Sequence, residues 1–75
     1  MKNRIRELRA RNRISQADLA EKLNVSRQTI NAIENDKYDP NLPLAFQLSH
    51  LFGESVDEIF DKKEFLTTIN QKPLE

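Results

Sequence analysis

Residues 15–35 constrain the fold of this chain more than any other stretch, because two short amphipathic patterns lie there with only three residues between them. Both patterns place apolar side chains on one side at helical spacing: Leu19, Ala20 and Leu23 in the first, and Ile30 and Ile33 in the second. Ser15 and Ser26 are suited to cap the two helices, and Asn24 accepts the left-handed backbone conformation of a tight turn. The stretch therefore predicts two helices that meet at a sharp angle.

The outward face of the second helix carries hydrogen-bonding groups. At about 100° per residue, five side chains fall within an arc of roughly 140° opposite the isoleucines: Arg27, Gln28, Asn31, Ala32 and Asn35. Arginine and glutamine can pair bidentately with base edges in the DNA major groove. An ordinary solvated polar face is the alternative interpretation of this pattern.

Three more helices are predicted, over residues 2–12, 42–52 and 55–60. Asn41 is suited to cap the second of these and Gly53 to end it, while Ser55 and Glu58 form a capping box for the third. The expected buried stripe of residues 42–52 consists of Leu44, Ala45, Leu48, Leu51 and Phe52. We expect Tyr38 to anchor the preceding loop in the core, and we expect no strand before residue 61.

Charge is distributed unevenly although the formal net charge is zero. Residues 1–37 hold nine Lys and Arg residues against five Asp and Glu residues, a net of +4, and residues 38–75 have a net of −4. Such a chain can present a positive face to phosphate and stay soluble. The arginines at 4, 6, 9, 11 and 13 spread around the first helix, so only some of them can face phosphate.

Composition excludes several function classes. The chain has no cysteine and one histidine, which argues against a disulfide or a structural metal site. Its start contains no apolar run, so we expect a cytoplasmic protein with no membrane segment. No nucleophile, catalytic pair or glycine-rich phosphate loop is apparent, so we expect neither enzymatic activity nor a cofactor or small-molecule ligand.

Four segments, in order and correctly spaced, resemble the Cro/cI-type helix-turn-helix family, also called the xenobiotic-response-element family. They are SQADLA from Ser15, VSRQTI from Val25, IEN from Ile33 and SVDEIF from Ser55, within a match of about 3–60. The resemblance implies an all-α, five-helix bundle whose second and third helices read double-stranded DNA. It also implies a transcriptional regulator, most simply a repressor.

The resemblance assigns roles to individual residues. Base contacts are expected from Arg27, Gln28, Asn31 and Ala32, and phosphate contacts from Gln16, Thr29, Asn35, Lys37 and Tyr38. Asn31 suits either a base or a phosphate. Arg9 and Glu34 match a family ion pair between the first and third helices. Many relatives have glycine where this chain has Arg13, Asn24 and Asp36.

Residues 62–75 form a tail after the predicted DNA-binding domain of residues 1–61. Thr67, Thr68 and Ile69 favour strand over helix, so residues 65–69 are the candidate for a short strand that pairs across a homodimer. The dimerisation candidates are Phe65, Leu66 and Ile69. A disordered tail is the alternative. A homodimer on a palindromic operator is the first hypothesis for the whole chain, and an antitoxin or another protein-interaction module is the second.

Overall fold

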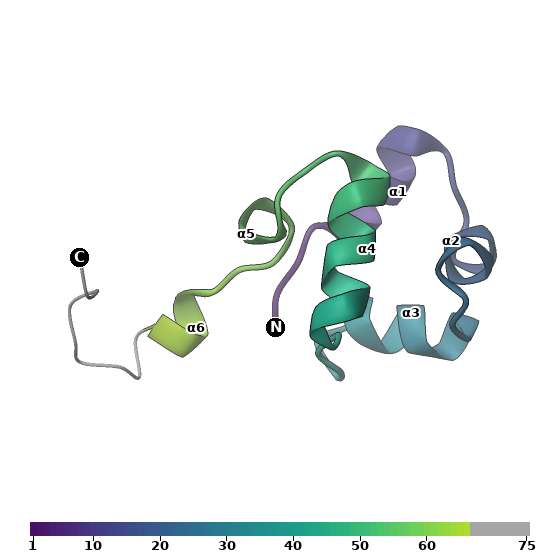
Figure 1. The fold of residues 1–75 in the computed structure, drawn as a ribbon. Helices are drawn as coiled ribbons and strands as arrows, with labels where there is room; N and C mark the ends of the chain where they lie inside the picture. The colour runs from purple at the N-terminus through teal and green to yellow at the C-terminus, as the bar shows by residue number, and fades with distance from the viewer. Residues whose placement is uncertain (67–75) are drawn as a thin grey trace.

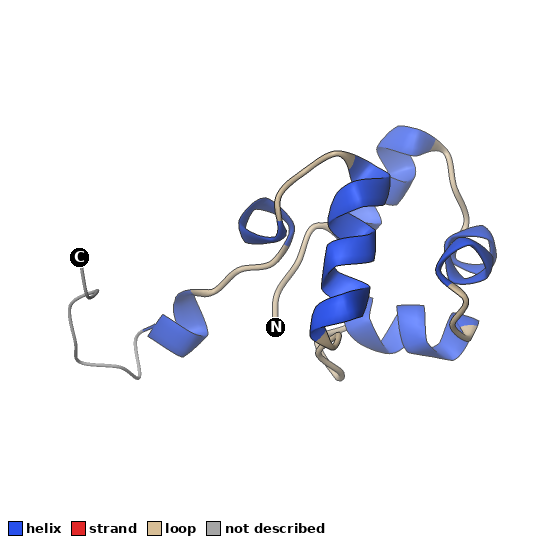
Figure 2. Cartoon of the chain, in the orientation of Figure 1, coloured by secondary structure: helices blue, strands red, loops and turns tan. Residues whose placement is uncertain are grey.

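The computed structural model describes residues 1–66 and is helical, as predicted. The elements in order are α1 (Ile5–Asn12), α2 (Gln16–Leu23), α3 (Arg27–Glu34), α4 (Leu42–Phe52), α5 (Val56–Ile59) and α6 (Lys63–Leu66). Helix α4 stands in the middle, with α1, α2 and α3 on one side of it and α5 and α6 on the other (Figure 1). No strand is drawn in the described part of the chain (Figure 2). This confirms the all-α class and the five helices of the bundle.

The predicted caps account for where the helices begin. Ser15 Oγ accepts from the Asp18 backbone N–H at 3.0 Å, and Ser26 Oγ accepts from that of Thr29 at 3.0 Å. Asn41 caps α4 in the same way, and Ser55 and Glu58 form the full capping box of α5. Each cap satisfies a backbone donor that has no partner within its own helix. Short-range sequence signals therefore set these helix starts.

Four residues adopt the left-handed conformation at the ends of helices: Arg13 (φ 55°), Asn24 (φ 56°), Asp36 (φ 63°) and Gly53 (φ 68°). The first three are the positions at which many relatives have glycine. Asn and Asp tolerate this conformation, whereas a long side chain such as that of Arg13 adopts it less readily. The three non-glycine residues thus adopt a backbone conformation that glycine adopts most readily.

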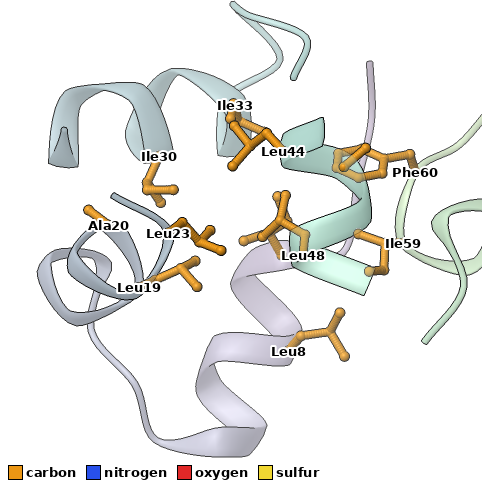
Figure 3. Close-up of a cluster of buried hydrophobic side chains, with 12 residues drawn as sticks. Leu8, Leu19, Ala20, Leu23, Ile30, Ile33, Leu44, Leu48, Ile59 and Phe60 are labelled. Atoms are coloured by element: carbon orange, nitrogen blue, oxygen red, sulfur yellow. The ribbon is translucent and has the colours of Figure 1, made fainter. Parts of the chain in front are cut away.

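The core is assembled from side chains of α1 to α5 together with Phe60, and Figure 3 shows them converging between the helices. Seven large side chains are almost completely buried: Ile5, Leu8, Leu19, Ile30, Ile33, Leu48 and Ile59. Val25 and Phe52 pack against this cluster and are partly buried. The three-helix corner of α1, α2 and α3 is therefore held by apolar contacts to α4 and α5.

Two expectations about the core were wrong. Tyr38 is 49% exposed, because Ile33 and Leu44 already supply the core side chains from the helices that flank its loop. Leu51 is also exposed, since the last turn of α4 lies at the edge of the core, where it lines a surface pocket with Asn12 and Phe52. Tyr38 stands alone in a loop and has no repeated spacing that would make its burial predictable. Leu51 does fit the helical spacing of the stripe, but it lies in the last turn of α4, where the core ends.

The first helix begins later than expected, at Ile5 instead of residue 2. The chain before it pairs with the segment after α5: the Arg4 backbone N–H donates to Ile59 O at 2.9 Å, and that of Asp61 donates to Lys2 O at 2.8 Å. Asn3 and Phe60 thereby form an isolated antiparallel bridge. This pairing joins segments far apart in the sequence, and no local pattern of residues predicted it.

The beginning of the tail is helical. The backbone of Phe65 and Leu66 belongs to α6, a single helical turn, so the strand expected there does not include them. The Leu66 side chain is exposed. Ile69 and the rest of the strand candidate lie outside the described residues, as does most of the proposed tail domain.

Candidate nucleic-acid interface

The angle between α2 and α3 is set by the turn and by the core beneath it. The Asn24 backbone N–H donates to Glu21 O at 3.2 Å, and the Val25 N–H donates to Ala20 O at 3.0 Å, which closes the end of α2 around the left-handed Asn24. Ile30 and Ile33 of α3 are buried against the helical corner. The opposite face of α3 must therefore point to solvent.

The predicted base-contacting residues lie on this outward face. Arg27 and Gln28 occupy the first two positions of α3, Asn31 follows one turn later, and all three are exposed. Within residues 1–66, their side chains have no hydrogen-bond partner on another residue. Ala32 is half-buried, which leaves a methyl group at the edge of the surface. The arrangement presents polar groups at the N-terminal end of a short helix.

The predicted phosphate-contacting residues surround α3 in different environments. Lys37 and Tyr38 are exposed in the loop after α3. Thr29 Oγ1 and Ser26 Oγ share a hydrogen bond of 2.8 Å, so the Thr29 hydroxyl belongs to the helix cap. Asn35 follows the last residue of α3, and its Nδ2 donates to Asn31 O at 2.8 Å.

Glu34, the last residue of α3, holds this helix in place through a buried carboxylate. Its side chain has no exposed area and accepts two hydrogen bonds from Arg9, from Nε at 2.5 Å and from Nη2 at 3.2 Å. Arg9 Nη1 also donates to Ile14 O at 3.1 Å. Burial by itself would raise the pKa of Glu34, but hydrogen bonds from Arg9 and Gln16 and the nearby arginine charges hold that pKa below its ordinary value.

Gln16 joins the second helix to the same carboxylate, with Nε2 donating to Glu34 Oε1 at 3.1 Å. A glutamine amide nitrogen has two N–H groups, so this bond leaves one donor of Gln16 for another acceptor. The carboxylate of Glu34 thus ties α1 and α2 to the end of α3. The orientation of α3 depends on a buried polar contact as well as on apolar packing.

Two residues near the N-terminus contribute to the interface scaffold without having been predicted. Asn3 Nδ2 donates to Ile33 O at 2.8 Å, and Asn3 Oδ1 accepts from the Ile5 backbone N–H at 3.2 Å. Arg6 Nη2 donates to Asn35 Oδ1 at 3.2 Å. The cap that Asn3 gives to the start of α1 could have been predicted, because asparagine is a common capping residue. Its contact with Ile33 of α3 could not, because the two residues are far apart in the sequence.

Comparison with known proteins agrees with this geometry. A helix-turn-helix family model matches residues 5–59. The chain is 53% identical over 60 residues to an uncharacterized HTH-type transcriptional regulator of Methanocaldococcus jannaschii, an alignment that covers 80% of this chain and 91% of that protein. It is 43% identical over 60 residues to the HTH-type transcriptional regulator YgzD of Bacillus subtilis, with 80% and 91% covered.

A third similar protein is an HTH-type transcriptional regulator of Archaeoglobus fulgidus, 40% identical over 60 residues that cover 80% of this chain and 86% of that protein. The chain belongs to the helix-turn-helix family of the Cro/cI, or xenobiotic-response-element, type. It is a DNA-binding transcriptional regulator of that family.

Two other kinds of site, a membrane-spanning helix and a metal cluster, are absent from the described part of the chain. No helix within residues 1–66 is long and apolar enough to cross a membrane. Over the same residues, no cluster of three or more histidine or acidic side chains is arranged to hold a metal ion. The surface of α3 and its surroundings is therefore the site on which we base the functional proposal.

Proposed function

We propose that this protein is a repressor that binds a palindromic operator as a homodimer and reads each half-site with α3. The observation that carries the proposal is the exposed polar face at the start of α3, held in orientation by the buried Glu34 carboxylate. A bound dimer that covers a promoter would exclude RNA polymerase sterically. Two copies related by two-fold symmetry would contact half-sites about one helical turn apart.

In this proposal, the residues of the interface have separate tasks. Arg27 pairs with guanine and Gln28 with adenine in the major groove, Ala32 offers a methyl contact to thymine, and Asn31 contacts a base or a phosphate. The backbone contacts come from Gln16, Thr29, Asn35, Lys37 and Tyr38, which fix the register of the protein on DNA. The remaining N–H of Gln16 and the exposure of Lys37 support these assignments.

The readout is tested by selecting bound sequences from random DNA with the purified protein and then measuring variants on the selected operator. Arg27→Ala and Gln28→Ala should each cost about 1–3 kcal/mol of binding free energy at one base position per half-site. Gln16→Ala should weaken binding to all sequences alike, because a phosphate contact carries no base information. An Arg27→Ala variant with unchanged affinity and preference would refute the direct-readout assignment.

We propose that dimer contacts come from α5, from the tail of residues 62–75, or from both, with Phe65, Leu66 and Ile69 as the apolar candidates of the tail. The exposed apolar side chain of Leu66, in the helical turn that follows α5, supports this assignment. Light scattering on the full-length chain and on residues 1–61 tests it, since the truncation removes no residue of the described core. Equal dimerisation of both forms would exclude the tail from the interface, and circular dichroism would show that residues 1–61 remain folded.

A further inference from the structure

The arginines of α1 and its N-cap, Arg4, fall into two groups that lie on different sides of the helix. Arg4 and Arg11 share the carboxylates of Glu7 and Glu54: Arg4 contacts them at 2.7 and 2.6 Å, and Arg11 contacts them at 3.0 and 3.5 Å. This group, the paired cluster, contains two cations and two anions. It is neutral without any ligand.

The second group contains Arg6, Arg9 and Glu34, and we call it the shared cluster. Arg9 is bound to Glu34 and is 16% exposed, whereas Arg6 is 66% exposed and approaches the same carboxylate with Nε at 3.5 Å. Two cations therefore share one anion, and the excess positive charge lies on the exposed member. An anion from solution would satisfy this charge.

The position of Arg6 connects that charge to the interface. Its Nη2 donates to Oδ1 of Asn35, the residue that follows α3, although the two residues are 29 positions apart in the sequence. An arginine carries five N–H donors, and the contacts to Asn35 and Glu34 leave several of them for a planar, bidentate contact to phosphate. The contact to Asn35 places Arg6 beside the C-terminal end of α3. Because Arg6 lies on α1 and not on α3, we do not expect it to contact a base.

We propose that Arg6 contacts a phosphate of the DNA backbone beside the end of α3 and positions Asn35 for the same strand. The inference rests on the proposed DNA readout by α3 and adds a contact from a different helix. The phosphate takes the place of the missing second carboxylate in the shared cluster. Arg11, on the same helix and 59% exposed, has its carboxylates already and serves as the matched control.

The experiment compares Arg6→Gln with Arg11→Gln at several salt concentrations, on the selected operator and on random duplex DNA. Each phosphate contact adds nearly one unit to the slope of log affinity against log salt, because counterions are released. We expect Arg6→Gln to make the negative slope less steep by about one unit and to weaken binding to both DNAs severalfold. Arg11→Gln should keep the wild-type slope. Thermal melting of the two variants confirms that both remain folded.

Several outcomes would overturn the inference. Equal slopes for Arg6→Gln, Arg11→Gln and the wild type would remove Arg6 from the phosphate contacts while leaving readout by α3 intact. An effect of Arg6→Gln that disappears in an Asn35→Ala background would leave Arg6 with a positioning role alone. Arg6→Lys keeps the positive charge, so its salt dependence should be close to that of the wild type; a slope equal to that of Arg6→Gln would also contradict the inference. A wild-type protein that binds no duplex DNA would overturn the proposed function as well.

Discussion

The paired cluster and the shared cluster both join arginines of α1 or its N-cap to glutamate carboxylates, yet they differ in burial and in charge. In the paired cluster, Arg11 and Glu7 are both more than half exposed, so solvent screens their attraction. In the shared cluster, Glu34 has no exposed side-chain area and Arg9 has little. The paired cluster consists largely of ion pairs at the protein surface, whereas the shared cluster holds α3 in its orientation.

The difference shows why a count of ion pairs says little about their effect. A buried carboxylate has lost its water and depends on its protein partners, so that removing one partner leaves an uncompensated charge. An exposed carboxylate regains water when its partner is removed. The two clusters should therefore respond very differently to the loss of a single glutamate, although each glutamate has two arginine partners.

The largest expected effect is that of Glu34→Ala. The substitution leaves the mostly buried Arg9 guanidinium without an anion and removes the hydrogen-bond acceptor of Gln16. We expect it to lower the free energy of unfolding by about 3 kcal/mol. Urea denaturation at neutral pH measures this loss. A Glu34→Ala variant as stable as the wild type would mean that apolar packing alone orients α3.

A smaller effect is expected from acid. Because the folded-state pKa of Glu34 lies below its ordinary value of 4.5, its contribution to stability is present above that pH and is lost as the pH falls through the folded-state value. The difference in unfolding free energy between the wild type and Glu34→Gln should therefore be constant near neutrality and narrow below about pH 4.5. Denaturation curves of both proteins over this range provide the measurement; a constant difference down to about pH 3 contradicts the prediction.

The smallest effect is expected from Glu7→Gln in the paired cluster. The hydrogen bond from Arg4 lowers the pKa of Glu7, but the side chain is half exposed and Glu54 remains as a partner for both arginines. The melting temperature should stay close to that of the wild type and should depend little on added salt. A loss comparable to that of Glu34→Ala would remove the distinction between the clusters.

Much of the interface was predictable from local sequence. The spacing of Ile30 and Ile33 fixed which side of α3 is buried, and hence that Arg27 and Gln28 are exposed. The pairing of Arg9 with Glu34 came from the family resemblance, since periodicity alone cannot match residues 25 positions apart. Arg6 was one of four arginines that the sequence could not tell apart, the others being Arg4, Arg11 and Arg13. The exposure of Tyr38 was missed because a single aromatic residue in a loop has no pattern to place it.

The sequence by itself determined the five helices of the bundle, the caps of α2 to α5 and the sharp turn after α2, because these depend on residues within a few positions of one another. It also determined the left-handed turns at Arg13, Asn24 and Asp36 to the extent that family glycine positions mark them. Only the tertiary structure decided that Arg6 approaches the Glu34 carboxylate, that Arg4 and Arg11 contact Glu54, and that residues 2–4 pair with residues 59–61. Those contacts join distant segments, and their geometry follows from the way the core brings α1, α3 and α5 together.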